Sequence, residues 1–327
     1  MSENNYWTSN LQERNCPLCG SNNHHIISSM MQYNLNLNTV ICKTCGFVFT
    51  NPIPEKSIYD SFYSTAYSDF YGHLTPRSIA DNNKRVPEFI KEKVKWISEI
   101  ELMTGKRILE IGPGKGFFLS YAKQCGNEVL GIEPSHTFFD ILQEDKIPCV
   151  YGSLDQFNKD ELGQFDNVVM FHVLEHFYNP NEALTQAWNF LKDSGLLILE
   201  VPNILKPFRS LDHYFLRYVH LSCFSPHTLD NFLKKHNFDP IFYNEGDTGW
   251  RAPNSVFVIA QKKKKNINNE IVPENWTDII LQLKNYRRTW RYWGKYRWAF
   301  YFEYVQIRRL YFRLGRFVKN HFLGVNY

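Results

Sequence analysis

A run of glycines placed directly after a short apolar stretch constrains the fold of this chain more than any other feature of its 327 residues. Residues 107–111 alternate in polarity and include β-branched side chains, which predicts a buried strand. Gly112, Gly114 and Gly116 follow at every second position, and the apolar residues 117–122 then predict a helix. Glycines at such a turn let the backbone approach a ligand and point free N–H groups at it. The stretch therefore predicts a ligand-binding turn in an α/β fold.

The spacing of this turn distinguishes two classes of nucleotide cofactor. The dinucleotide fingerprint is G-x-G-x-x-G, and here the third glycine comes one residue early. Glu110 precedes the first glycine, and a carboxylate there would repel a pyrophosphate but suits a cationic ligand. The pattern E-x-G-x-G-x-G formed by Glu110, Gly112, Gly114 and Gly116 resembles motif I of the class I S-adenosylmethionine-dependent methyltransferases. The resemblance implies that these four residues bind the cofactor.

Further landmarks of that family follow in the expected order. Residues 127–133 predict a second strand that ends in Glu133, an acid placed to accept both ribose hydroxyls. Residues 148–154 predict a third strand and a turn, where the resemblance implies that Ser153 and Leu154 hold the adenine. Two more strands are predicted over 165–172, which ends in the candidate cofactor ligand His172, and over 195–203. Helical stretches between the strands, over 135–145, 181–192 and 226–236, favour a doubly wound, Rossmann-like α/β sheet, with strands 239–244 and 255–260 at its edge.

Two C-x-x-C motifs lie near the N-terminus, Cys16/Cys19 and Cys42/Cys45, each followed by a glycine. Four thiolates from paired motifs of this kind form a closed tetrahedral site, which predicts a structural zinc ion. The total of 7 cysteines is odd, which argues against a disulfide framework. We interpret His24 and His25 as solvated rather than ligating, and Cys125, Cys149 and Cys223 as buried thiols.

Four regions are predicted along the chain. A zinc-binding ribbon covers residues 10–55, and a tyrosine-rich helical lid or connector covers 56–103. The cofactor-binding core covers 104–261, and the exposed tract 262–265 opens a basic, aromatic helical extension that covers 262–327. The regularly spaced tyrosines of residues 58–73 are consistent with core packing and with a lid over the acceptor pocket, and Tyr71 is a catalytic candidate.

Methyl transfer to a hydroxyl needs a base near neutral pH, for which histidine is the usual residue. His176 follows the fourth predicted strand, and His220 lies between the fifth strand and the next helix. A four-cysteine ribbon, a tyrosine-rich segment and this core together resemble the sugar methyltransferases, particularly the nucleotide-sugar C-methyltransferases. Their Y-x-E-H motif is only partly kept, because Arg217 and Val219 stand at the tyrosine and glutamate positions. We therefore expect O-methylation of a sugar or nucleotide sugar, with His220 as the leading base and His176 as the second candidate.

Alternatives to this function remain open at this point. One is carbon methylation of a sugar; another is a non-catalytic zinc-ribbon protein with a vestigial core; His220 could also simply cap the following helix. Nucleic acid is disfavoured as an acceptor, because no Asn-Pro-Pro-Tyr motif follows the fourth strand and the body of the chain is acidic. We expect a small-molecule acceptor.

Residues 275–327 hold 11 lysines and arginines against 2 acidic residues, whereas the whole chain carries only +4. Helix packing, a peripheral membrane contact and nucleic-acid binding are all consistent with this extension, and an oligomer is compatible with it. No run of eighteen apolar residues and no signal peptide is present, which predicts a cytoplasmic protein.

Overall fold

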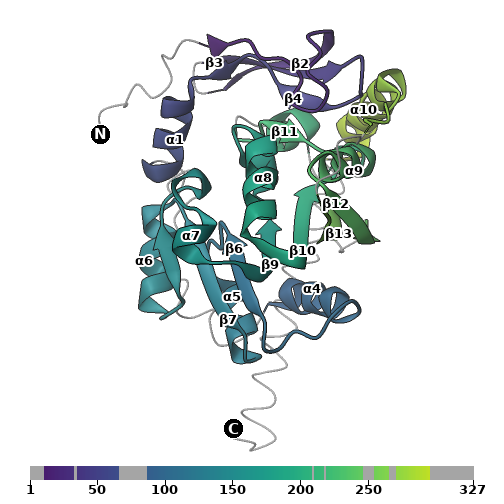
Figure 1. Ribbon diagram of the computed structural model, residues 1–327. Helices are drawn as coiled ribbons and strands as arrows, with labels where there is room; N and C mark the ends of the chain where they lie inside the picture. Colours follow the sequence, from purple (N-terminus) through teal and green to yellow (C-terminus); the bar gives the residue numbers. More distant parts are fainter. Residues whose placement is uncertain are drawn as a thin grey trace, which may run out of the picture.

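The computed structural model describes residues 11–32, 35–65, 87–207, 210–216, 219–245, 254–264 and 270–294. Its centre is a seven-stranded sheet in the order β12-β13-β10-β9-β6-β7-β8 (Figure 1). The five strands from β10 to β8 are parallel, and β13 and β12 add an antiparallel edge. This is the Rossmann-like, doubly wound α/β architecture that the sequence predicts.

The strands of this sheet are β6 (Arg107–Ile111), β7 (Glu128–Glu133), β8 (Cys149–Tyr151), β9 (Phe165–Phe171), β10 (Leu191–Pro202), β12 (Phe238–Asn244) and β13 (Ser255–Lys262). The helices of the core are α4 (Glu88–Ser98), α5 (Phe117–Gln124), α6 (His136–Glu144), α7 (Lys159–Leu162), α8 (Pro180–Phe190) and α9 (Pro226–Lys235). Short 3-10 turns form η1 (Leu154–Gln156) and η2 (Leu174–His176), and a π-helical turn forms η3 (Leu211–Phe215).

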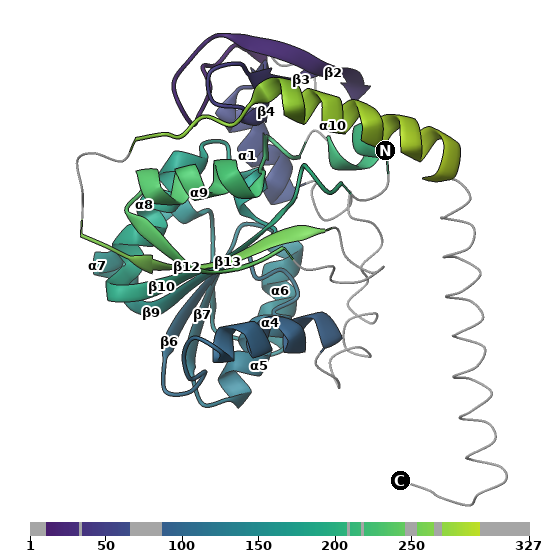
Figure 2. The ribbon, with the colours of Figure 1, turned by 90° about the vertical axis from the view of Figure 1, so that its right-hand side faces the viewer.

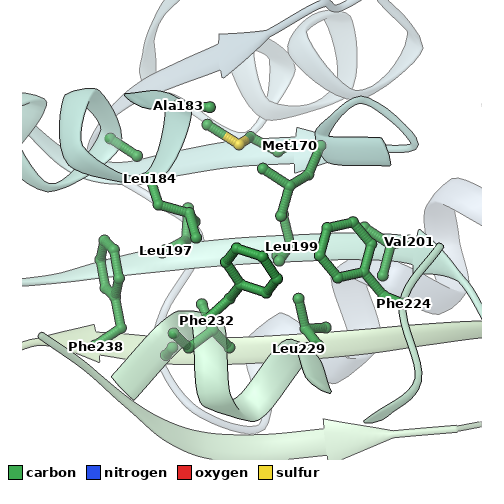
Figure 3. Packing of buried hydrophobic residues seen from close by; sticks show 14 of the residues in the cluster. Met170, Ala183, Leu184, Leu197, Leu199, Val201, Phe224, Leu229, Phe232 and Phe238 are labelled. Atoms are coloured by element: carbon green, nitrogen blue, oxygen red, sulfur yellow. The ribbon is translucent and has the colours of Figure 1, made fainter. Parts of the chain in front are cut away.

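Helices cover both faces of the sheet, as apolar parallel strands require. Helices α8 and α9 lie on one face, and α4 and α5 lie on the other (Figure 2). On the first face, Leu184 of α8 and Phe232 of α9 pack onto Met170, Leu197 and Leu199 (Figure 3). All five side chains are fully buried, so this layer is dry and closely packed.

The N-terminal ribbon forms a second, four-stranded sheet in the order β11-β4-β3-β2. Its strands are β2 (His24–Gln32), β3 (Leu35–Cys42) and β4 (Val48–Thr50), and β11 (Ser222–Cys223) joins them from the core region. Strands β1 (Leu11–Gln12) and β5 (Ile53–Pro54) make a small separate pair. Because β11 lies just after His220, the ribbon is bonded directly to the segment that carries a predicted catalytic residue.

Aromatic packing fastens the ribbon to the core. Phe47 of the ribbon packs against both Phe224 and Phe232, with ring centroids 5.5 Å and 4.9 Å away, and those two rings also contact each other. Helix α10 (Trp276–Thr289) lies along the outer side of the ribbon, and the π-helical turn η4 (Trp290–Gly294) follows it (Figure 2). Ile279 and Leu283 of α10 are buried against ribbon residues, so this part of the extension packs as a helix.

Some details differ from the sequence-based expectations. Lys262 is not part of an exposed linker: it ends β13 at 6% exposure, and its ammonium group donates to the carbonyl of Leu191. Of the three cysteines expected to be buried, Cys125 and Cys149 are half-buried. Among the described residues, no helix combines the length and apolar character needed to cross a membrane. The remainder of the basic extension, residues 295–327, lies outside the described residues.

Candidate functional site

A pocket of about 840 Å³ opens at the carboxyl ends of the parallel strands. Most of the predicted cofactor and catalytic residues line it, namely Gly112, Gly114, Glu133, Ser153, Leu154, His172 and His176. Glu110, Gly116 and His220 are not among its lining residues. The crevice beyond the carboxyl ends of the strands is where α/β sheets bind ligands, so this pocket is the candidate active site.

The glycine turn supplies space rather than hydrogen-bond donors. Gly112, Gly114 and Gly116 all have positive φ angles, of 65°, 55° and 67°. Their N–H groups are already bonded, to the carbonyl of Ile132, the carboxylate of Glu133 and the carbonyl of Pro113. The expectation that free N–H groups of these glycines point at a ligand is therefore not met in this structure.

Gly114 and Gly116 have different spatial roles. A Cβ on Gly114 would meet no atom within 4 Å, so its face is open to the pocket. A Cβ on Gly116 would collide with Leu142 and would lie 2.8 Å from Ile147. Gly116 therefore allows α5 to pack closely on the core, and Gly114 leaves room for a ligand.

Glu133 ends β7 and is 4% exposed. Its carboxylate accepts hydrogen bonds from the backbone N–H of Gly114 at 3.0 Å and of Ser135 at 2.8 Å. Burial raises the pKa of Glu133 to about 7, although those two bonds oppose the shift. The carboxylate is thus held at the edge of the pocket, at the position predicted to receive ribose hydroxyls.

Glu110 lies beneath the pocket rather than at its mouth. Its side chain is 4% exposed, and its Oε2 has no hydrogen-bond partner among the described residues. Burial raises the pKa of Glu110 to about 8, which Lys93 opposes and Glu133 reinforces. Direct cofactor contact by Glu110, which its position in the motif predicts, is not visible in this arrangement.

His172 takes part in a buried charged network at the floor of the pocket. Its Nε2 lies 3.4 Å from Glu200 Oε1 and its Nδ1 lies 3.6 Å from Glu175 Oε1. Lys93 of α4 pairs with the second oxygen of Glu200, and the Ser255 hydroxyl donates to the first. Burial would lower the pKa of His172, but the two carboxylates outweigh it and raise that pKa to about 9.

Apolar and aromatic side chains from three elements line the pocket. Leu154 is 4% exposed at the start of η1, and Phe138 of α6 and Tyr151 of β8 are further lining residues. The N–H of Ser153 donates to Gln156, which caps the η1 turn. An apolar floor with an aromatic side wall suits a flat purine ring.

Helix α1 (Lys56–Thr65) lies along the pocket and carries part of the tyrosine-rich segment. Tyr59 is 2% exposed, and its hydroxyl lies 2.8 Å from the carbonyl of His176 and 3.1 Å from that of Val219. Tyr63 is half-buried, and its ring centroid lies 6.1 Å from that of His176. Tyr59 therefore anchors the helix, whereas Tyr63 forms part of the pocket wall. Tyr71 lies outside the described residues.

The two candidate histidines, His176 and His220, lie against each other although they are distant in the sequence. His176 is 43 positions from Val219, the residue that directly precedes His220. Their ring centroids are 5.0 Å apart. His176 belongs to η2 and lines the pocket, and His220 stands behind it. His220 does not cap α9: Ser225 does so by accepting from the N–H of Thr228, and His220 Nδ1 lies 2.6 Å from the carbonyl of Phe215.

Arg14 of the ribbon holds the His220 segment in place. Its guanidinium donates to the carbonyls of Thr50 at 3.0 Å, Tyr178 at 3.0 Å and Leu221 at 2.7 Å. The Thr50 hydroxyl donates to the carbonyl of His220 at 3.2 Å. The ribbon thus forms part of the support of the candidate active site.

The four predicted metal ligands come together in the ribbon. The sulfur atoms of Cys16, Cys19, Cys42 and Cys45 all lie within 4.8 Å of one another. Two of the Sγ–Sγ distances are 3.5 Å, far longer than a disulfide bond and close to the edge of about 3.8 Å expected for a tetrahedron with zinc–sulfur bonds of about 2.3 Å. Four thiol donors in this arrangement fit a structural zinc ion. His24 and His25 lie on β2 and are not part of the cluster.

Several residues of the site were not predicted from the sequence. Glu175 was visible only as the neighbour of His176, whereas Lys93, Glu200 and Arg14 lie in separate elements with no local pattern that marks them. Lys93 pairs with Glu200, which is 107 positions away, and Arg14 donates to Leu221, which is 207 positions away.

Residues 82–241 match the family model of the methyltransferase domain. The chain contains a methyltransferase domain. Among curated proteins, this domain is similar to the ubiquinone biosynthesis O-methyltransferase of Dechloromonas aromatica (strain RCB), with 25% identity over 143 residues, 41% of this chain and 62% of that protein. The enzyme of the same name from Pseudomonas aeruginosa (strain LESB58) is 27% identical over 117 residues, 34% of this chain and 50% of that protein. The chain thus spans about half to three-fifths of the length of these relatives.

Solved methyltransferase structures resemble the domain as well. The 1,6-didemethyltoxoflavin-N1-methyltransferase of Burkholderia thailandensis aligns with a TM-score of 0.49 at 14% identity, over 74% of this chain and 100% of that one. An S-adenosylmethionine-dependent methyltransferase from Listeria monocytogenes, described as putative, aligns with a TM-score of 0.45 at 16% identity, over 53% of this chain and 97% of that one.

Proposed function

We propose that the methyltransferase domain transfers a methyl group from S-adenosylmethionine to a hydroxyl group of a small polar acceptor, with a sugar or nucleotide sugar as the first candidate. The observation that carries the proposal is a single pocket that contains both the Glu133 carboxylate beside an open glycine turn and the His176 ring. The names of the curated relatives support transfer to oxygen. The resemblance of the ribbon, tyrosine segment and core to sugar methyltransferases supports the acceptor class.

In this proposal, different residues of the pocket bind different parts of the cofactor. When bound, the cofactor supplies a methyl group activated by a positively charged sulfur. Glu133 accepts the ribose hydroxyls, the open face of Gly114 admits the cofactor close to the backbone, and Leu154 and Ser153 hold the adenine. Fixing both reactants in line supplies a large part of the rate in such a transfer.

The histidine pair takes up the proton that the acceptor hydroxyl releases. His220 is the leading base expected from the sequence and His176 the second candidate. His176 forms part of the pocket wall and can meet the acceptor directly, whereas His220 stands behind it and takes part through the contact between the two rings. Replacing His220 with alanine should lower turnover by roughly a hundredfold or more and leave cofactor affinity unchanged, as expected for loss of a general base.

We further propose that Cys16, Cys19, Cys42 and Cys45 hold a structural zinc ion. A site made of four thiolates is closed, so it has no ligand position left for a substrate. Its role is to keep the ribbon folded against the His220 segment, through Arg14 and Thr50.

The test of cofactor binding is calorimetry of the full chain with S-adenosylhomocysteine. We expect binding by the wild type and at least a tenfold weaker affinity for Glu133→Gln, because a carboxylate that accepts hydroxyl hydrogen bonds is lost. Glu128→Gln is the matched control, since Glu128 begins the same strand on the surface and pairs with Arg107. Absence of binding by the wild type would reject the proposal in favour of a vestigial core.

The acceptor is tested separately, by incubating the protein with radiolabelled S-adenosylmethionine and a panel of nucleotide sugars, free sugars and phenols. Label that is incorporated into a sugar and that hot hydriodic acid releases as methyl iodide, by cleavage of a methyl ether, supports O-methylation. Label found only in phenols, or attached to sugar carbon, would contradict the proposed acceptor or the proposed atom.

A further inference from the structure

Glu175 is a buried carboxylate that faces three histidines and has no place yet in the proposed chemistry. It lies in η2 directly after β9 and is 2% exposed. Its Oε1 lies 3.7 Å from His176 Nε2 and 3.6 Å from His172 Nδ1. One oxygen of Glu175 and one ring nitrogen each of His176 and His220 lie within 4.8 Å of one another.

The surroundings keep this carboxylate ionised. Burial by itself would raise the pKa of Glu175, but the charges of His176, His172 and His220 and a hydrogen bond from His172 outweigh it, so that the pKa lies below its ordinary value. Its second oxygen, Oε2, is buried without a hydrogen-bond partner in the described part of the chain. A negative charge in this position requires a positive partner nearby.

Both pocket histidines are fixed from the other side of the ring. His176 Nδ1 lies 2.7 Å from the carbonyl of Val219, and His220 Nδ1 lies 2.6 Å from the carbonyl of Phe215. A carbonyl oxygen only accepts hydrogen bonds, so each Nδ1 carries a hydrogen. Each ring therefore gains and loses its second proton at Nε2, and Nε2 of His176 faces Glu175.

We propose that Glu175 is a positioning residue: its carboxylate orients the His176–His220 pair and balances the positive charge that this pair acquires when it deprotonates the acceptor. The inference rests on the proposed function. As the bond between the methyl carbon and the acceptor oxygen forms, the bond between that carbon and sulfur breaks and its electron pair stays on sulfur. The hydroxyl proton moves to an imidazole, so one positive charge passes from sulfur to a ring beside Glu175.

The other groups around the pair do not supply this balance. Tyr63 of α1 faces His176 with its ring, and burial raises the pKa of Cys223 on β11, which keeps that thiol neutral. Glu200 is the other carboxylate of the network, and it is already paired with Lys93. Among the described residues around the pair, Glu175 is the anion in position to stabilise an imidazolium at His176.

A divalent metal is the rival occupant, because two imidazoles and a carboxylate are a common ligand set for transition metals. A metal ion would take the Nε2 lone pairs that accept the proton, so the two roles exclude each other. The experiment therefore contains an arm for each.

The experiment is NMR of the zinc-loaded full chain with ¹⁵N-labelled histidine side chains, titrated from pH 5 to pH 9. His176→Gln and His220→Gln identify the two signals. We expect both rings to show the Nδ1–H tautomer when neutral, and Glu175→Gln to lower the titration midpoint of His176 by at least about one pH unit, as loss of a close anion does. The midpoint of His172 should fall as well, since it faces the same carboxylate.

Two further variants serve as controls, one for specificity and one for failure of the Glu175→Gln variant to fold. Glu101→Gln is the matched control, because Glu101 also has a buried oxygen without a partner among the described residues but pairs with Lys106 away from the pocket. It should leave the midpoints of His172 and His176 unchanged. Glu175→Asp keeps the charge and should keep the His176 midpoint within about half a pH unit of the wild type if Glu175→Gln fails to fold.

Unchanged midpoints in a folded Glu175→Gln variant would overturn the proposal. So would a shift of both histidine signals on addition of millimolar Mg²⁺ or Zn²⁺ that disappears in Glu175→Gln, which would make the group a metal site. S-adenosylhomocysteine affinity is measured on the same samples and should be equal in wild type and Glu175→Gln. If the wild type does not bind it while the midpoint still falls, the proposed function fails and the pairing of Glu175 with His176 stands.

Discussion

Glu133 and Glu110 are both 4% exposed and lie on adjacent strands, yet only one of them reaches the pocket. Glu133 ends its strand, and its carboxylate is held by one N–H group of the glycine loop, that of Gly114, and by the N–H of Ser135 in the turn after its own strand. Glu110 is one residue from the end of β6 and points into the protein interior, where one oxygen has no partner among the described residues. A difference of one position along a strand therefore separates an acid that lines the pocket from one that does not.

The affinity for S-adenosylhomocysteine should depend on pH through Glu133. Its pKa is raised to about 7 by burial, and ribose hydroxyls donate to the ionised form. Below pH 7 the carboxylate must lose a proton before it binds, so affinity should fall by up to about tenfold for each pH unit and level off above pH 8. Calorimetry between pH 5.5 and pH 8.5 measures this. A flat profile in the wild type would show that Glu133 does not bind the ribose, and Glu133→Gln should remove the slope.

The glycine turn needs residues that adopt a positive φ and that carry no side chain, and glycine meets both requirements. All three glycines have positive φ, which costs other residues about 1–2 kcal/mol. Gly116 must also pass close to Leu142 and Ile147, whereas the side of Gly114 is open. The turn is thus shaped by packing at its helix end and by ligand access at its centre.

Alanine substitutions should separate these roles. Gly116→Ala should lower the free energy of unfolding by about 2–4 kcal/mol, because backbone strain and overpacking add. Gly114→Ala should lower it by only about 1–2 kcal/mol but weaken S-adenosylhomocysteine binding at least tenfold, since its Cβ enters the pocket. Urea unfolding and calorimetry on both variants measure the contrast. Equal losses of stability together with unchanged affinity in Gly114→Ala would contradict it.

In the whole molecule, the ribbon and the methyltransferase domain form a joint structure around His176 and His220, on the side of the pocket where we propose that the acceptor binds. Strand β4 pairs with β11, Phe47 packs against Phe224 and Phe232, and Arg14 donates to the carbonyl of Leu221. Strands β6 and β7, which lead into the glycine turn and end in Glu133, pair only with sheet neighbours of the domain in the described structure. Damage to the ribbon should therefore affect the acceptor side first.

Removal of zinc tests this division. Chelation, or Cys42→Ser, should lower the midpoint of thermal unfolding by roughly 10 °C or more, because a structural zinc site contributes its binding energy to folding. The His176 and His220 signals should broaden, while S-adenosylhomocysteine affinity stays within about threefold. Metal analysis, thermal scans and calorimetry give the three readouts; Cys125→Ser is the control, since Cys125 is half-buried and lies outside the cluster. Loss of cofactor affinity along with the metal would show that the two halves are not separable.

Local patterns were sufficient for the cofactor core and the ribbon. The strands along the chain, the glycine turn and the clustering of the four cysteines could be predicted because each depends on neighbouring residues: strand alternation, glycine spacing and the reach of two thiols from one tight turn. The predicted helix over 181–192 and the observed α8 (Pro180–Phe190) agree for the same reason, since Asn179 and Pro180 begin the helix locally.

Long-range contacts decided the rest. Only the folded chain brings His176 against His220, places Glu175 beside them, turns Glu110 inward and uses the three glycine N–H groups within the protein. Arg14 reaches Leu221 across 207 positions of sequence. Contacts of this kind depend on how separate elements pack, which no local spacing encodes. The amino-acid sequence by itself therefore determined which cofactor chemistry the core is built for, because the glycine turn and the strands depend on local spacing. Tertiary packing determined which residues meet around the pocket, because those contacts join distant segments.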